Sequence, residues 1–319
     1  MPLRYDPEFA AAAGPALSAL HAAFKAPPKS DPYALRDVIA GMVAPLAALP
    51  KIPTVEVTTY QVPSAEGHSI AVYGIIPKQQ PSTPGPAILH AHGSGFIQGS
   101  AKDWVKIYAP RVEATGVPIF TVDYRLAPEH PFPAAVNDVY TALTWLYEHA
   151  AEVGLDISRI AVMGESAGGG LAAGVALMAR DKGLTPPLAK QILLYPVLED
   201  RNVVTKAAFE PFLLWNWDNN ATAFNAYLGD KAGKDDVSPY AAPARASSLE
   251  GVAPMYVDVG GLDIYLDECI AYGGRAASAS VEVELHVYPG VPHGFEALGV
   301  GTSVINRVWA NRDAAMKSF

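Results

Sequence analysis

The chain has 319 residues, of which half are hydrophobic and 17% are charged, a composition typical of a globular protein rather than a disordered one. Its net charge of -9 and its lack of a basic run weigh against a nucleic-acid-binding protein. Cys269 is the only cysteine, so the chain can form neither an intramolecular disulfide nor a thiolate metal cluster.

The N-terminal stretch is not expected to act as a signal peptide. Asp6 and Glu8 precede its apolar part, and Pro15 and His21 interrupt that part. No apolar run of about 18 residues, the length needed to cross a membrane, occurs in the sequence. We therefore expect a cytoplasmic protein without a membrane span.

Two helices and then a series of strands are predicted along the first part of the chain. From Glu8 to Leu49 apolar residues recur at helical spacing, and APPKSDP divides this stretch into two helices. The alternating segments TVEVTTYQV and HSIAVYGIIP then predict an antiparallel strand pair. Six further apolar runs are typical of strands: GPAILHAH, VPIFTVDY, RIAVMGE, KQILLYP, APMYVDVG and VEVELHVYP.

Helices are predicted between several of these strands, at about residues 133–151, 167–182, 266–279 and 302–318. This alternation predicts an α/β fold with a mostly parallel eight-stranded sheet flanked by helices. The interval from 200 to 230 is too long and too aromatic for a simple connection, so we interpret it as a helical insertion. The predicted organisation has cap helices in residues 1–50, a core in residues 51–199 and 231–319, and a cap insertion in residues 200–230.

The segment MGESAGGG places Ser166 between a predicted strand and a predicted helix. A serine at such a turn is held above the sheet, where Gly164 and Gly168 allow the backbone to pack closely. The Ala167 N–H, at the start of the helix, can then stabilise an oxyanion. On these residues alone, the alternative is that Ser166 caps the helix and the glycines only pack it against the sheet.

HGSGF is a turn of small residues after a predicted strand, and its backbone N–H groups could reach a substrate oxygen. Glycines in 93–99 followed by Asp123 also suggest a dinucleotide fingerprint, and residues 227–231 offer a YxxxK pair. That pair contains a glycine and lies at the end of the insertion, which disfavours a dehydrogenase. His90 and His92 share one strand face, but no third metal ligand stands nearby, so no metal or cofactor is expected.

A serine nucleophile needs a base, and the base needs an acid that fixes its tautomer. Of the two histidines after Ser166, His286 lies inside a predicted strand, whereas His293 follows that strand in a loop and is the candidate base. Asp263, in the loop after the preceding strand, is the candidate acid. Taken singly, each has a structural alternative, a histidine in a turn and an aspartate at a helix cap. The other acids nearby fall within the strand or the next helix: Asp258, Asp267 and Glu268.

From about Thr54 to Phe319 the chain resembles the hormone-sensitive-lipase-like esterases, an α/β-hydrolase group. HGSGF, DYRLAPEHPFPAAVND, GESAGGG, LDIYLDE and PHGF occur in the order found in that family. The resemblance implies that the N-terminal helices and the insertion form a cap over the active site. It also implies a catalytic triad and three oxyanion-hole N–H donors: Ser166, Asp263 and His293, with Ser94, Gly95 and Ala167.

Two departures from the family pattern leave the chemistry intact. Ser94 replaces the middle glycine of HGGG and adds a hydroxyl near the oxyanion, and LDIYL lacks the arginine that often follows the family's aspartate. The predicted function is hydrolysis of carboxylic esters through an acyl-enzyme on Ser166, without a cofactor. Lactonase or amidase activity is the near alternative. A non-catalytic receptor similar to the plant gibberellin receptors is a second, although retention of His293 counts against it.

Apolar residues of the cap segments predict a pocket for a short-chain, aryl or lactone ester. Packing of cap to body is the ordinary role of such residues, and some of them are expected to serve only that role. The candidate substrate-binding residues are Phe96, Phe212, Leu213, Trp215, Trp217, Leu20 and Phe24. Because family members often dimerise through the last strand, a homodimer through about 281–288 is also expected.

Overall fold

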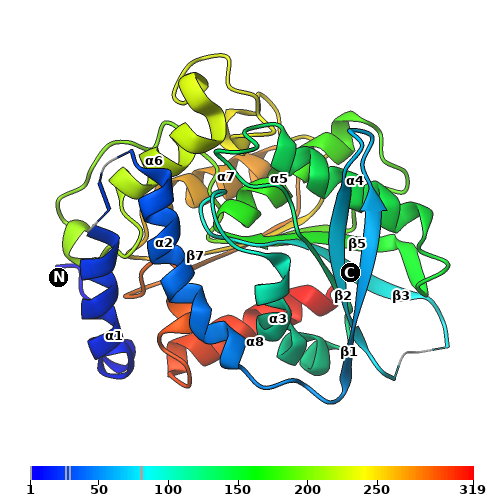
Figure 1. Ribbon diagram of the computed structural model, residues 1–319, viewed down its shortest axis with the longest axis horizontal. Coiled ribbons are helices and arrows are strands. Elements are labelled where there is room, and N and C mark those ends of the chain that lie inside the picture. The colour runs from blue at the N-terminus through cyan, green and yellow to red at the C-terminus, as the bar shows by residue number, and fades with distance from the viewer. Residues whose placement is uncertain (1, 26, 29, 80–81) are drawn as a thin grey trace.

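The computed structural model describes residues 2–25, 27–28, 30–79 and 82–319, and an eight-stranded sheet lies at its centre (Figure 1). The strands follow one another across the sheet in the order β1-β2-β4-β3-β5-β6-β7-β8. Their bounds are β1 Val55–Pro63, β2 Ser69–Pro77, β3 Gly85–Ala91, β4 Ile119–Val122, β5 Leu155–Glu165, β6 Lys190–Leu194, β7 Met255–Gly260 and β8 Val283–Tyr288.

Only β2 runs against its neighbours; it pairs antiparallel with both β1 and β4, and every other pairing is parallel. A tight hairpin, in which the Ser64 N–H donates to the His68 carbonyl at 2.8 Å, joins β1 to β2. The parallel strands need longer crossovers, which helices supply. The predicted α/β fold with a mostly parallel eight-stranded sheet is therefore confirmed.

The helices cover the sheet and extend beyond it (Figure 1). Those predicted between the strands are present, and the structure adds α3, which the sequence interpretation omitted. Ser100 caps α3 and Gly116 ends it in the left-handed conformation at φ 72°, while Pro110 lies inside it, a residue more typical of a break. The bounds are α1 Pro7–Lys25, α2 Pro32–Val43, α3 Ala101–Thr115, α4 Ala134–Glu148, α5 Ala167–Asp181, α6 Trp217–Leu228, α7 Leu266–Ser278 and α8 Ser303–Lys317.

The N-terminal helices lie beside α6, which belongs to the 200–230 segment (Figure 1). The Thr222 hydroxyl accepts the Ser30 N–H at 3.2 Å, and the Asn219 amide donates to the Phe24 carbonyl at 3.3 Å. Two segments that are distant in the sequence thus form one helical layer.

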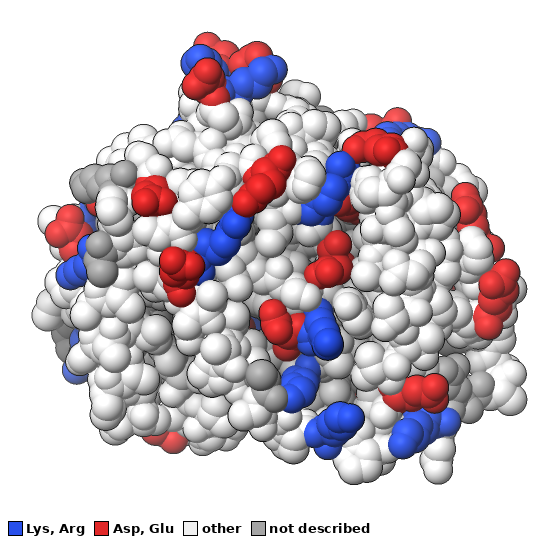
Figure 2. Space-filling view, in the orientation of Figure 1, with Lys and Arg blue, Asp and Glu red and all other residues white. Residues whose placement is uncertain are grey.

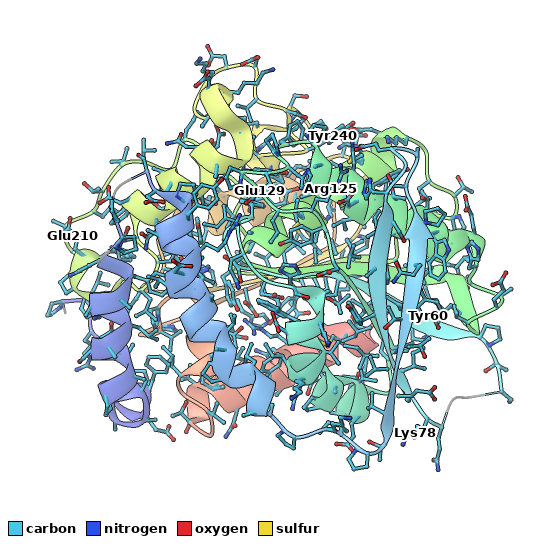
Figure 3. All side chains as sticks on the ribbon, viewed as in Figure 1. Tyr60, Lys78, Arg125, Glu129, Glu210 and Tyr240 are labelled. Atoms are coloured by element: carbon cyan, nitrogen blue, oxygen red, sulfur yellow. The ribbon has the colours of Figure 1, made fainter. Side chains whose placement is uncertain are left out.

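Ion pairs hold the DYRLAPEHPFPAAVND segment together and tie it to α2; Figure 3 labels Arg125 and Glu129. Arg125 binds the buried Asp138 at 2.8 Å, within the same segment. Glu129 pairs with Arg36 of α2 at 2.6 Å, and Arg36 also donates to the Ile97 carbonyl at 2.6 Å. Arg36 therefore joins α2 to the loop that follows β3.

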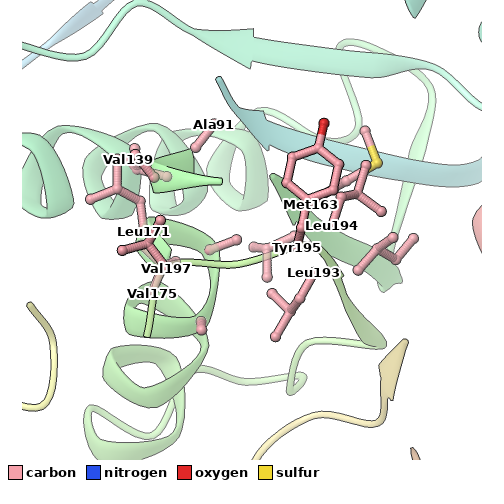
Figure 4. Close-up of a cluster of buried hydrophobic side chains, with 14 of the residues drawn as sticks. Ala91, Val139, Met163, Leu171, Val175, Leu193, Leu194, Tyr195 and Val197 are labelled. Atoms are coloured by element: carbon pink, nitrogen blue, oxygen red, sulfur yellow. The ribbon is translucent and has the colours of Figure 1, made fainter. Parts of the chain in front are cut away.

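The core lies between the sheet and its helices, and Figure 4 shows the part around β5 and β6, where Met163, Leu171 and Leu194 are buried. On the face shown in Figure 2, acidic and basic side chains are interspersed. Among the helices of the described residues, none is both long enough and apolar enough to cross a membrane.

Candidate active site

Ser166 occupies a sharp turn between the end of β5 and the start of α5. Its backbone has φ 55° and ψ −122°, a region that favours glycine and costs about 1–3 kcal/mol for other residues. The surroundings hold this conformation, because the Ser166 N–H donates to the Leu194 carbonyl at 2.9 Å and the Val197 N–H donates to the Ser166 carbonyl at 3.0 Å. The turn presents the hydroxyl at the carboxyl end of the parallel strands.

Two glycines allow this turn to pack against β3. A Cβ on Gly164 would lie 2.2 Å from the Gly168 carbonyl oxygen, and a Cβ on Gly168 would lie 2.0 Å from the Ala91 carbonyl oxygen. Both contacts are impossible for any larger residue without movement of the backbone. The GxSxG spacing thus follows from the close approach of α5 to β3.

Ser166, His293 and Asp263 form one continuous hydrogen-bonded chain. Ser166 Oγ lies 2.8 Å from His293 Nε2, and His293 Nδ1 lies 2.7 Å from Asp263 Oδ2. An ionised carboxylate beside Nδ1 favours the tautomer with its proton there, which leaves Nε2 to accept the serine proton. The Asp263 side chain is fully buried, whereas 12% of the His293 side chain is exposed. The structure therefore brings together three residues that follow three different strands.

Two aromatic rings flank the imidazole of His293. Tyr195, directly after β6, and Tyr265, two residues after Asp263, lie with their ring centroids 4.8 and 5.1 Å from that of His293. Both meet it edge to face. The Tyr265 N–H also donates to Asp263 Oδ1 at 3.0 Å, so the acid is held from a second side.

The other acids and the second histidine considered from the sequence have different partners. Asp258 binds Arg312 at 2.7 Å, Asp267 pairs with Lys206 on the surface, and His286 lies 2.8 Å from Glu284. Glu268 is buried and accepts the Leu198 N–H and the Asn202 side-chain amide, both at 2.7 Å. Burial raises the pKa of Glu268 well above its usual value, and these hydrogen bonds only partly oppose that effect.

The HGSGF loop passes beside the serine. Ser94, Gly95 and Phe96 have φ values of 88°, 65° and 65°, three successive left-handed residues. A Cβ on Gly93 would lie 3.5 Å from the Ser166 Cβ, so the loop and the turn are in close contact. The segment that carries the candidate oxyanion donors thus lies against the candidate nucleophile.

A buried carboxylate beneath this loop was missed by the sequence interpretation. Glu165 accepts the Gly93 N–H on Oε1 at 2.7 Å, and its Oε2 accepts the Tyr108 hydroxyl and contacts His90 Nε2, both at 2.8 Å. His90 Nδ1 in turn lies 2.8 Å from the Thr121 hydroxyl. Burial opposes ionisation, but His90 and the hydrogen bonds outweigh it, so the pKa of Glu165 is lowered.

His92 does not share a site with His90. Its ring stacks between Trp104 and Tyr124, and its Nδ1 lies 2.9 Å from the Gly93 carbonyl oxygen. Within the described residues, no group of three or more His, Cys, Asp or Glu side chains is arranged to hold a metal ion. The two histidines instead support the loop.

The candidate substrate-binding residues separate into two groups. Trp215 lies over the HGSGF loop, since a Cβ on Gly95 would meet its ring at 2.8 Å, and Phe24 packs against Trp215 with ring centroids 6.1 Å apart. The other candidates have different contacts. Phe96, within the loop, stacks on Tyr227 at 4.2 Å, Phe212 packs on Tyr5, and the Trp217 N–H donates to Asn202. Leu213 is buried, and Leu20 is half-buried against the core.

Comparison with known proteins places this chain in a family. A family model described as alpha/beta hydrolase fold matches residues 88–297. The chain is 39% identical over 216 residues to Esterase LipI of Mycobacterium tuberculosis. The aligned segment covers 66% of this chain and 65% of LipI. It is 32% identical over 244 residues to Ethyl acetate hydrolase of Pseudomonas putida, and this alignment covers 73% of the chain and 74% of the hydrolase.

Among solved structures, the one titled Bacterial Heroin Esterase superposes with a TM-score of 0.87 at 36% identity and covers 98% of this chain and 97% of that one. The shared fold extends well beyond the segment that the family model matches. The chain therefore belongs to the α/β-hydrolase family and, within it, to the hormone-sensitive-lipase-like carboxylesterases.

Proposed function

We propose that this protein is a serine carboxylesterase in which Ser166 is the nucleophile, His293 the general base and Asp263 the acid that orients the base. The hydrogen-bonded chain from Ser166 Oγ through His293 to Asp263, with links of 2.8 and 2.7 Å, carries the proposal. The strained turn at Ser166 supports it, because such strain persists where function requires it.

In the proposed reaction, Ser166 Oγ attacks the ester carbonyl carbon as His293 Nε2 accepts the hydroxyl proton. Backbone N–H groups of Ser94, Gly95 and Ala167 bind the oxyanion, and one such donor can contribute about 10²–10³ in rate. The intermediate collapses as His293 returns the proton to the leaving alcohol. His293 then takes a proton from water as the water oxygen attacks the acyl carbon, and it returns that proton to Ser166 Oγ as the carboxylic acid leaves.

The cap is part of the proposal. Residues 1–50 and 200–230 form it, and residues 51–199 and 231–319 form the hydrolase body. The position of Trp215 over Gly95, with Phe24 behind it, supports a short acyl site and hence short-chain, aryl or lactone esters. Relatives named for ethyl acetate and heroin are consistent with this choice. A lactone would use the same acyl-transfer groups.

Burst kinetics test the mechanism. p-Nitrophenyl esters from acetate to laurate are mixed with the wild type and with Ser166→Ala, and nitrophenol release is followed from the first milliseconds. We expect an acyl-enzyme burst in the wild type, no burst in Ser166→Ala, and a rate that falls with acyl length. Equal rates in the two proteins would exclude Ser166 as the nucleophile, and an optimum at laurate would exclude the short acyl site.

Two further proposals concern the whole protein. The chain forms a homodimer through β8, which ends the sheet and leaves a row of backbone groups for a second copy to pair with. Light scattering of the wild type and of Val287→Lys, at a 41% exposed position of β8, tests this, with a dimer expected only for the wild type. A cytoplasmic location remains a prediction, to be tested by cell fractionation.

A further inference from the structure

A guanidinium group lies fully buried behind the triad. Arg312 of α8 has no solvent exposure, and its Nε and Nη2 bind Asp258 at 2.7 and 3.0 Å. Its Nη1 lies 3.3 Å from Glu296 Oε1. A buried charge is costly unless it is paired, and here one guanidinium faces the carboxyl groups of two residues. A buried ion cluster is by itself weak evidence for stability, because apolar residues of similar volume often replace one without loss.

The partners of Arg312 belong to the segments that carry the proposed triad. Glu296 is three residues after His293, and Asp258 lies in β7, five residues before Asp263. Tyr195 directly follows β6, whose last carbonyl accepts the Ser166 N–H. One side chain thus contacts a residue inside β7, the residue directly after β6 and the turn that follows β8.

The contacts on the His293 side are the most direct. The Tyr195 hydroxyl donates to Glu296, and the Tyr195 ring meets the imidazole of His293 in a T-shaped contact with centroids 4.8 Å apart. The Arg312 guanidinium lies 5.4 Å from the Tyr195 ring and 5.6 Å from the Phe295 ring. Glu296 and Tyr195 are therefore held to each other, to Arg312 and, through the ring of Tyr195, to His293.

We infer that Arg312 is a positioning residue for His293: through Glu296 and Tyr195 it fixes the turn that carries the proposed base, while Asp258 anchors the guanidinium to the strand that leads to Asp263. This inference rests on the proposed esterase function. Misplacement of a base by about 1 Å can lower a rate about 10²-fold, so a cluster that never touches substrate can control kcat.

Glu296→Gln, Tyr195→Phe and Asp313→Asn form the test set. Glu296→Gln removes the negative charge that faces Arg312, and Tyr195→Phe removes the hydroxyl that donates to Glu296; both variants leave Arg312 paired with Asp258. Asp313, the next residue along α8, pairs instead with Arg111 at 3.1 Å and serves as the control for loss of a carboxylate from this region. Steady-state kinetics on p-nitrophenyl acetate give kcat and KM, and circular-dichroism melting gives the folded fraction and melting temperature.

We expect Glu296→Gln and Tyr195→Phe to lower kcat about tenfold per folded molecule and to change KM by less than about twofold. The control, Asp313→Asn, should retain the wild-type kcat. Arg312→Lys keeps a cation and should retain more of kcat than Arg312→Met. If Arg312→Met fails to fold, the two partner variants still decide the question.

Wild-type kcat in Glu296→Gln and Tyr195→Phe, with only a lower melting temperature, would assign the cluster a purely structural role and overturn the inference. Ser166→Ala is assayed alongside. Activity in that variant rejects the proposed function itself, whereas an inactive Ser166→Ala beside fully active partner variants rejects only the role of Arg312.

Discussion

The Gly93 backbone N–H donates to Glu165 Oε1 at 2.7 Å, so the residue before the proposed nucleophile holds the loop that carries the proposed oxyanion donors. The two halves of the site are thereby fixed to each other by a buried side chain. Tyr108 and His90 bind the second oxygen of the same carboxylate. The geometry of the oxyanion loop should consequently depend on an acceptor at position 165.

Glu165→Met and Glu165→Gln test this dependence. Gln keeps an oxygen for the Gly93 N–H, whereas Met leaves that donor, His90 and Tyr108 without their acceptor. We expect kcat on p-nitrophenyl acetate to fall about 10²-fold in Glu165→Met and only a few-fold in Glu165→Gln, since loss of one oxyanion donor has an effect of the larger size. Equal losses in the two variants would show that the charge matters rather than the acceptor.

His92 should make stability depend on pH. Burial lowers the pKa of His92 from its usual 6.5, so the folded protein keeps the ring neutral while the unfolded chain binds a proton below pH 6.5. Because the folded pKa is depressed, the stabilisation is complete above pH 6.5 and is lost as the pH falls below it, at up to about 1.4 kcal/mol per pH unit.

His92→Phe retains the stacking between Trp104 and Tyr124 and removes the titrating group. The free energy of unfolding, measured with urea at pH 7.5 and pH 5.5, should fall by about 1 kcal/mol more in the wild type than in the variant. An identical fall in both proteins would locate the acid sensitivity in other groups.

Local patterns predicted the sheet because each strand is a short apolar run bounded by turn residues. Chain order together with a loop position after a predicted strand selected Asp263 and His293 from their neighbours. The same reasoning omitted α3, where Pro110 and interspersed Lys and Asp residues interrupt the helical pattern. Tertiary packing and the caps at Ser100 and Gly116 outweigh that interruption.

Glu165 and Arg312 show what local patterns leave open. Glu165 is an ordinary variable position of GxSxG, and its partners Gly93 and His90 come from the neighbouring strand and its loop, more than 70 residues away. Arg312 stands beside Asp313 on α8, a charge pattern typical of a solvated helix face. Its burial depends on Asp258, 54 residues earlier, inside a strand. Only the folded chain brings these charges together.

A hydrogen bond between the proposed cap and the loop of Asp263 leads to the last prediction. The Tyr265 hydroxyl donates to Asn220 Oδ1 of α6 at 2.8 Å, and both side chains are buried. Tyr272, seven residues further on in α7, is equally buried, but within the described part of the chain its hydroxyl has no hydrogen-bond partner. Both tyrosines are buried, and they can be compared by the hydrogen bond that the Tyr265 hydroxyl donates to Asn220.

Tyr265→Phe removes the donor and leaves the Asn220 oxygen buried without it, which should lower the free energy of unfolding by about 1–3 kcal/mol. Tyr272→Phe removes a buried hydroxyl that makes no hydrogen bond within the described residues, so the free energy of unfolding of this variant should be unchanged or slightly higher. Amide hydrogen exchange should accelerate across Trp217–Leu228 in Tyr265→Phe alone, because α6 loses its bond to the loop of the proposed acid. Two results would contradict this prediction: a similar loss of stability in both variants, or unchanged amide exchange in α6. Either result would show that packing of the rings, and not the hydrogen bond, joins α6 to the loop of Asp263.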